Sequence, residues 1–109
     1  MKVRTFLVAV GLTAVFESAS AISPPVEVTP MEEKARQCSA CHGGNGISIN
    51  ALWPNLAGQK EGYLVKQLKD FRAGKRKDPL MAPIIKSMSD TDIAEFAAYF
   101  SSLKPSPAK

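Results

Sequence analysis

Histidine and cysteine are scarce in this 109-residue chain, which contains one histidine and two cysteines. A structural zinc site needs four ligands, so these three soft ligands are too few to complete one. Aromatic residues are also few, at 7% of the chain, and are not interleaved with the basic residues; with a net charge of only +4, this argues against a nucleic-acid partner. No stretch sustains an alternation of apolar and polar residues, which argues against a β-sheet. No phosphate-binding loop and no acid–base pair in an apolar setting is present, which weighs against a hydrolase or a transferase.

Long hydrophobic runs are missing as well. The longest run, residues 5–16, has about a dozen residues before Glu17 ends it, whereas a membrane-spanning helix needs about 20. It follows the basic residues 1–4 and precedes the A-x-A sequence Ala19-Ser20-Ala21. These features predict that residues 1–21 are a secretory signal peptide, that the mature protein is periplasmic, and that it has no stable membrane insertion after cleavage.

The histidine and both cysteines lie within one short stretch, Cys38-Ser39-Ala40-Cys41-His42. The pattern C-x-x-C-H is typical of c-type haem attachment, in which two thiols bond to the porphyrin and the imidazole ligates the iron. On a helix, Cys38 and Cys41 lie about one turn apart, so both can face one edge of the ring. We therefore predict one covalently bound haem c, with Cys38 and Cys41 as its attachment points and His42 as an axial iron ligand.

Two other interpretations of the cysteines are weaker. A thioredoxin-type dithiol would need a βαβ context, and the sequence around Cys38 indicates a helix without a Val/Ile-rich strand. A plain disulfide in an exported protein is compatible with the spacing, but it gives no reason for His42 to follow Cys41 directly.

Capping signals and apolar periodicity predict three helices. Thr29-Pro30-Met31-Glu32 combines an N-cap threonine, a proline at the first helical position and a capping-box glutamate, so we place a helix from Pro30 to about Cys41. Residues 60–73 are amphipathic and end before a glycine. Ser89 and Asp92 form a second capping box, followed by apolar positions at helical spacing up to residue 103.

The predicted fold class is all-α, a compact domain of three to four helices around one covalently bound haem. The domain covers residues 30–104. It follows an extended, proline-containing lead-in at residues 22–29 and precedes a disordered tail at residues 105–109.

Two aperiodic apolar segments connect the predicted helices. Residues 47–56 carry Trp53, Ile47 and Ile49, which we expect to be buried as a wall of the haem pocket, although ordinary loop packing is the alternative. Residues 78–83 form a second loop stiffened by two prolines.

The second iron ligand has to be something other than histidine, because no other histidine exists. A methionine thioether, a lysine, a tyrosine or an open position remain. Met31 is on the helix that bears the attachment site, and Met88 just before a helix cap is explained by packing. Met81 lies in the proline-bracketed loop, so we predict Met81 as the distal ligand, with gap-filling as the alternative.

The chain resembles the class I c-type cytochromes, particularly the small bacterial monohaem proteins and the single halves of periplasmic dihaem cytochromes. The similarity covers nearly all of residues 30–103. The similar residues are Cys38-Ser39-Ala40-Cys41-His42-Gly43, Pro54-Asn55-Leu56-Ala57-Gly58-Gln59, Tyr63-Leu64 with Gln67-Leu68 and Phe71, Gly74-Lys75-Arg76, Met81, and Ser89-Asp90-Thr91-Asp92-Ile93 leading to Ala97-Ala98-Tyr99-Phe100.

The resemblance implies a compact all-α cytochrome c fold of three to four helices around one covalently bound haem, and it implies roles for individual residues. His42 would be the proximal and Met81 the distal iron ligand, and the carbonyl of Pro54 would accept a hydrogen bond from the other ring nitrogen of His42. Arg76 would lie near the haem propionates, with Arg72 close enough in sequence to compete for that place.

These inferences predict a soluble periplasmic electron carrier that transfers one electron at a time and is not an enzyme. Its partners would be a redox donor and a redox acceptor, including a membrane-bound or periplasmic oxidoreductase. The basic residues between Lys66 and Lys77 are expected either to speed encounter with an acidic partner or to be only a solvated face. Two other functions stay open: a haem subunit of a larger redox enzyme, and a ligand-binding or peroxidatic haem protein with an open iron position.

Overall fold

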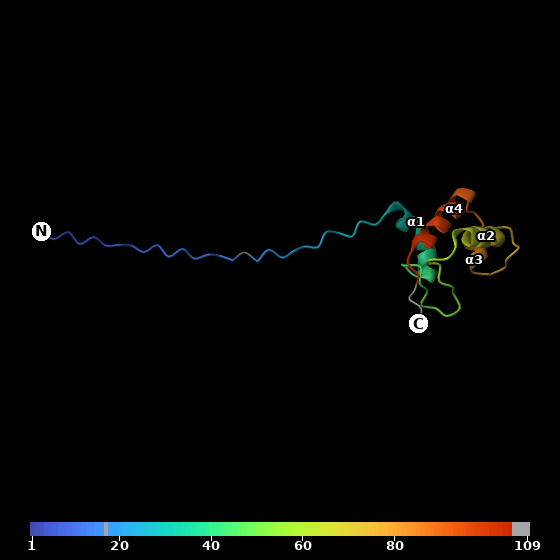
Figure 1. The fold of residues 1–109 in the computed structure, drawn as a ribbon, viewed down its shortest axis with the longest axis horizontal. Coiled ribbons are helices and arrows are strands. Elements are labelled where there is room, and N and C mark those ends of the chain that lie inside the picture. The colour runs from blue at the N-terminus through green and yellow to red at the C-terminus, as the bar shows by residue number, and fades with distance from the viewer. Residues whose placement is uncertain (17, 106–109) are drawn as a thin grey trace.

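The computed structural model describes residues 1–16 and 18–105, and the regular elements within them are four helices (Figure 1). The predicted all-α fold is confirmed. Predictions that concern Glu17 and residues 106–109 lie outside the described residues. The helices, in chain order, are α1 (Pro30–His42), α2 (Glu61–Arg72), α3 (Met81–Ile85) and α4 (Asp90–Ser102).

The chain before α1 is extended and exposed over its described residues, and it leads away from the helices in Figure 1. None of the described helices has the length and apolar character needed to cross a membrane.

Two of the helices begin at the predicted capping boxes. At α1, the Thr29 hydroxyl accepts from the Glu32 amide at 3.2 Å and the Glu32 carboxylate accepts from the Thr29 amide at 2.7 Å. At α4, Ser89 and Asp92 make the same reciprocal pair at 3.0 and 2.9 Å. Each box satisfies amides that the first helical turn leaves without a partner, which fixes where the helix starts.

Helix α3 was not expected, because residues 78–83 were predicted to be an aperiodic loop. In the structure, the Asp78 carboxylate accepts from the amides of Leu80 and Met81 at 2.8 and 2.9 Å. The Ala82 amide also donates to the Asp78 carbonyl at 3.0 Å, which is a helical hydrogen bond. A helix of five residues is too short to show an apolar period, so pattern reading alone misses it.

The hydrophobic core lies where α2 packs against α3 and α4. The apolar positions predicted for the last helix, Ile93, Phe96 and Phe100, are all buried, with Ile93 fully so. Burial of one such side chain contributes about 1.5–3 kcal/mol. The other members of the buried cluster are Ala35, Leu64, Phe71, Ile85, Met88 and Ala97.

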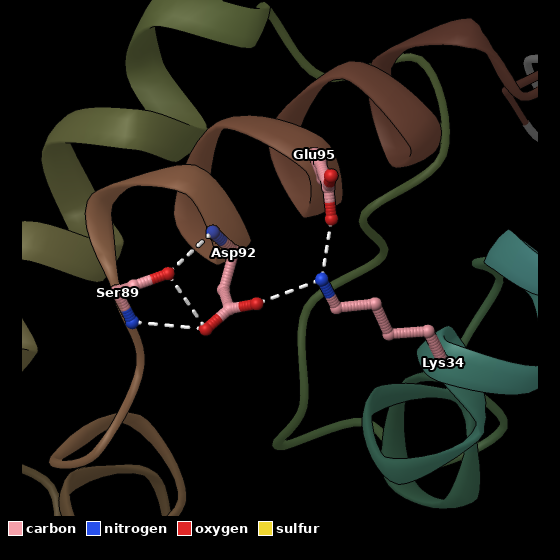
Figure 2. Close-up of polar contacts among 4 residues, drawn as sticks. All are labelled: Lys34, Ser89, Asp92 and Glu95. Carbon is pink, nitrogen blue, oxygen red and sulfur yellow. Dashed lines mark hydrogen bonds and ion pairs between the residues drawn. The ribbon is translucent and has the colours of Figure 1, made fainter.

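Lys34 links helix α1 to α4, as Figure 2 shows. The Lys34 ammonium lies 2.7 Å from Asp92 Oδ1, forms a close ion pair with Glu95, and lies 5.6 Å from the centroid of the Phe96 ring. The hydrogen bond that Lys34 donates to Asp92 is the largest cause that raises the pKa of Lys34. Exposed ion pairs contribute little to the free energy of unfolding. We therefore expect this cluster mainly to fix the orientation of α1 on α4.

We expect Asp92→Asn to change how stability depends on pH. Hydrogen bonds from Lys34 and Ser89 lower the pKa of Asp92 from 3.8 to about 2. The carboxylate therefore stabilises the fold above its unfolded pKa, and this stabilisation is lost as pH falls from 3.8 towards 2. The variant should be less stable than the wild type at neutral pH, and the difference should shrink in that window.

Urea unfolding from pH 7 down to pH 2 measures this effect. Glu33→Gln is the matched control, because Glu33 forms an exposed ion pair with Arg36 within α1 and does not join two helices. A difference between wild type and Asp92→Asn that stays constant from pH 7 to pH 2 would contradict the prediction.

Candidate functional site

One cavity of about 240 Å³ lies between the C-terminal half of α1, the loop at residues 52–59, and helices α2, α3 and α4. Its walls are mostly apolar side chains. Six residues singled out in the sequence line it together: Cys38, Cys41, His42, Pro54, Arg76 and Met81. They come from four separate parts of the chain, so the fold and not the sequence order brings them to one place.

His42 is the last residue of α1 and is 6% exposed. Its Nδ1 atom lies 2.8 Å from the carbonyl oxygen of Pro54. A carbonyl oxygen can only accept, so Nδ1 carries the proton and the lone pair is on Nε2. No hydrogen bond to Nε2 is found among the described residues, which leaves that atom available to the cavity.

The loop after α1 turns back to bring Pro54 over His42. Gly43 ends the helix at φ +89°, a left-handed conformation, and a Cβ at this position would collide with the carbonyl of Ile47. The Gly46 carbonyl then accepts from the Leu56 and Ala57 amides at 2.8 and 3.0 Å. These bonds close the loop directly after Pro54, and the Trp53 amide donates to the Asn50 carbonyl at 3.1 Å directly before it, so backbone contacts on both sides hold the Pro54 carbonyl in place.

Both cysteines are free thiols and are half-buried on the cavity wall. Burial raises the pKa of the Cys38 thiol to about 11. Reactive dithiols have the opposite feature, a lowered pKa that keeps a thiolate at neutral pH. The site is therefore not poised for thiol–disulfide exchange. Within the described ranges, no three His, Cys, Asp or Glu side chains are grouped to hold a metal ion by themselves.

Two methionines are candidates for the distal iron ligand, because Met81 and Met88 both line the cavity. Met31 instead lines a separate shallow groove between α1 and α4. Met81 is not in a loop as expected, because it is the first residue of α3. Met88 is 8% exposed and belongs to the buried cluster, and its carbonyl accepts from Arg72 at 2.9 Å.

Arg76 and Arg72, the two candidates for the place near the haem propionates, have different positions in the structure. Arg76 lines the cavity, with its guanidinium 4.5 Å from the Phe71 ring centroid and a hydrogen bond of 2.7 Å to Gln67 Oε1. Arg72 is not on the cavity wall and binds Asp90 at 2.5 Å in addition to the Met88 carbonyl. Gln67 is among the residues that carry the resemblance, but the sequence assigned it no role, because its contact with Arg76 spans the end of α2 and leaves no local pattern.

The loop at residues 47–56 is only partly buried. Trp53 lines the cavity as expected, but Ile49 is fully exposed and Ile47 is only half-buried. The expectation was therefore wrong for Ile49, and Ile47 does not line the cavity either. Hydrogen-bonded turns at Ser48 and Asn50 carry this stretch around the outside of the domain, and the apolar side chain between them points away from the core.

The groups in the cavity fit a covalently attached haem. Cys38 and Cys41 would hold one edge of the porphyrin, and the Nε2 atom of His42 would reach the iron. Apolar walls suit the ring, and the Arg76 guanidinium suits a carboxylate at the opening. The fit rests on two free thiols, an imidazole with a fixed tautomer, and a thioether on the same cavity.

Comparisons with known proteins agree with this fit. Residues 33–104 match the family model for cytochrome c. Cytochrome c4 of Pseudomonas aeruginosa is 39% identical over 102 residues, covering 94% of this chain and 48% of that protein. The thiosulfate dehydrogenase electron acceptor of Thiomonas intermedia is 36% identical over 104 residues, covering 94% of this chain and 46% of that protein.

Comparison with solved structures also finds cytochrome c4. The crystal structure of reduced recombinant cytochrome c4 from Pseudomonas stutzeri superposes with a TM-score of 0.64 at 42% identity, covering 68% of this chain and 44% of that one. The chain spans about half the length of these relatives. The match over residues 33–104 and the geometry of the cavity lead to one conclusion: this chain belongs to the cytochrome c family.

Proposed function

We propose that this protein is a periplasmic electron carrier with one haem c, ligated by His42 and Met81, and that it is not an enzyme. One observation carries the proposal: two free thiols, a methionine thioether and an imidazole whose Nδ1 proton is held by Pro54 all line one apolar cavity. A bound haem supplies one-electron chemistry through its iron. A full set of two axial ligands leaves no position for a substrate, which favours a carrier over a catalyst.

The chain's own residues have distinct parts in this proposal. Cys38 and Cys41 fix the cofactor covalently. The Pro54 carbonyl accepts the Nδ1 proton of His42 at 2.8 Å, which orients the ring and raises the basicity of Nε2. Met81 supplies the thioether from the first turn of α3.

Burial and charge then tune the site. Apolar side chains such as Leu68 and Phe100 line the cavity and would keep water away from a bound ring. Arg76 is held by Gln67 and Phe71 at the cavity wall, where its positive charge would compensate the propionate carboxylates. The resemblance to the class I c-type cytochromes supports this role of Arg76.

The periplasmic location is part of the same proposal. Residues 1–21 have the basic start, short apolar run and A-x-A site of a signal peptide, and residues 22–29 would form the lead-in to a domain at residues 30–104. Removal of the first segment would leave the helical domain and the cavity intact, because α1 begins at Pro30.

The partners are proposed to be a redox donor and a redox acceptor, including a membrane-bound or periplasmic oxidoreductase. Similarity to a protein named as the electron acceptor of thiosulfate dehydrogenase supports a dehydrogenase as the donor. The same similarity favours a second candidate, in which this chain is a fixed haem subunit of a larger redox enzyme. Purification decides between them, since a carrier is isolated alone and a subunit is isolated with its catalytic chain.

A redox titration with a peroxide assay tests the carrier function. The isolated protein should be reduced and reoxidised reversibly in a single one-electron step, and it should not turn over hydrogen peroxide with an electron donor. Multiple turnovers with peroxide at the rate of an authentic peroxidase would contradict the proposal and favour an open iron position.

We expect surface charge to act on the rate of electron transfer. Lys75 and Lys77 flank Arg76, which lines the cavity, whereas Lys66 is already paired with Asp70 at 2.5 Å. The double variant Lys75→Gln/Lys77→Gln should slow reduction or oxidation by an acidic partner at low salt, and salt should remove most of the difference. Stopped-flow rates over a range of ionic strength measure this.

Lys66→Gln serves as the control for the charge effect, because its charge is locally compensated. Rates that do not vary with ionic strength, for wild type and variants alike, would mean that the basic residues are only a solvated face.

A further inference from the structure

Asp78 makes more contacts to the start of α3 than any pattern in the sequence indicated. One carboxylate oxygen, Oδ1, accepts from the Leu80 amide at 2.8 Å and from the Met81 amide at 2.9 Å. The Asp78 carbonyl accepts from the Ala82 amide at 3.0 Å. A single residue therefore binds three consecutive backbone amides around Met81.

These bonds decide the direction in which the chain enters α3. The helix has only five residues, so few hydrogen bonds of its own hold its first turn. Pro79 has no amide to contribute, and Leu80, the residue before Met81, makes no side-chain cap and is exposed. Without the Asp78 carboxylate, the amides of Leu80 and Met81 would lose the partner that fixes them.

Asp78 is also placed beside the cavity and not on a remote surface. It is half-buried and lines the same cavity as Met81 and Arg76. Its bond to the Met81 amide is thus a direct connection from the cavity wall to the backbone of the proposed iron ligand. The amide and the thioether belong to one residue, so moving the first shifts the second.

We propose that Asp78 is a positioning residue for Met81: its carboxylate fixes the first turn of α3 and keeps the Met81 thioether directed into the cavity. This inference rests on the proposed ligation by Met81. Asp78 does not touch the cofactor in this role and acts through the backbone alone. A residue that only capped a helix would stabilise the folded protein, but it would not change how firmly the Met81 sulfur binds the iron.

The test compares two substitutions at position 78 in the haem-loaded protein. Asp78→Ala removes the acceptor of both amide bonds, whereas Asp78→Asn keeps an oxygen at the Oδ1 position and removes the charge. Thr29→Ala is the matched control, because it removes a helix cap of the same kind at α1, away from Met81.

Two measurements report on the sulfur. The first is the weak far-red band that a methionine ligand gives to ferric haem, and the second is the dissociation constant of imidazole, which has to displace that ligand. Asp78→Ala should weaken the band and bind imidazole about fivefold or more tightly, the effect expected from losing a helix cap. Asp78→Asn and Thr29→Ala should stay within about twofold of the wild type.

The outcomes separate this inference from the proposed function. A wild type with the band, together with an Asp78→Ala protein that has the same band and the same imidazole affinity, overturns the inference alone. An equal change in Thr29→Ala also overturns it, because stability would then be the cause. A wild type without the band overturns both.

If Asp78→Ala does not fold, amide hydrogen exchange in the wild-type protein replaces this variant as the test. Rapid exchange of the Leu80 and Met81 amides would contradict the inference.

Discussion

The double variant Cys38→Ser/Cys41→Ser is expected to carry no covalent haem. Both thiols are free and line the cavity, and each would form one of the two bonds to the porphyrin. Either single substitution should leave one bond and reduce the retained haem. Haem staining of the protein on a denaturing gel measures this directly.

Ser39→Ala is the control for the double variant, since Ser39 lies inside the attachment stretch without a thiol. It should retain haem as the wild type does. Covalent haem in the double variant would contradict the attachment site.

Loss of the cofactor should also unfold the domain. The cavity has mostly apolar walls, so loss of the cofactor would expose apolar side chains of the core to water. A small domain has a whole stability of only about 5–15 kcal/mol, so losing this burial should be a large effect. Far-UV circular dichroism of the double variant should therefore show most of the helical signal lost.

The second large effect is expected from Met81→Ala. Removing the thioether should abolish the far-red band of the ferric protein, open the iron to added ligands, and lower the reduction potential by on the order of 0.1 V, since axial ligands set haem potentials over a wide range. Absorption spectra, carbon monoxide binding and potentiometry measure the three changes.

Two other methionines provide matched controls for Met81. Met88 also lines the cavity, but it packs in the buried cluster and its carbonyl is fixed by Arg72 at 2.9 Å. Met31 is outside the cavity, in the groove between α1 and α4. Met88→Leu and Met31→Leu should leave the band and the potential nearly unchanged. If Met88→Leu removes the band and Met81→Ala does not, the sulfur has been assigned to the wrong residue, although the proposed electron-carrier function is not contradicted.

The parts of the fold that the sequence predicts correctly depend on short-range chemistry. The capping boxes at Thr29 and Ser89 each need only four consecutive residues, so they can be read directly, and both helices start where expected. The attachment stretch is equally local. Helix α2 has enough turns for its apolar face to be visible, and its observed ends differ from the predicted ends by one residue.

The missed features depend on contacts between distant residues or on elements too short to show a period. Helix α3 spans only five residues, and the Asp78 carboxylate that accepts from the Met81 amide lies three positions before the first helical residue. The choice between Arg72 and Arg76 needs the positions of their partners, Asp90 and Gln67, which sequence spacing does not supply.

The central claim is a haem iron held between His42 and a methionine sulfur, and the visible spectrum of the purified wild-type protein in both redox states tests it most directly. We expect a low-spin spectrum in both states, a far-red band in the ferric protein, and slow or absent carbon monoxide binding by the ferrous protein. A high-spin spectrum without the band, together with rapid carbon monoxide binding, would contradict the claim and identify an open iron position.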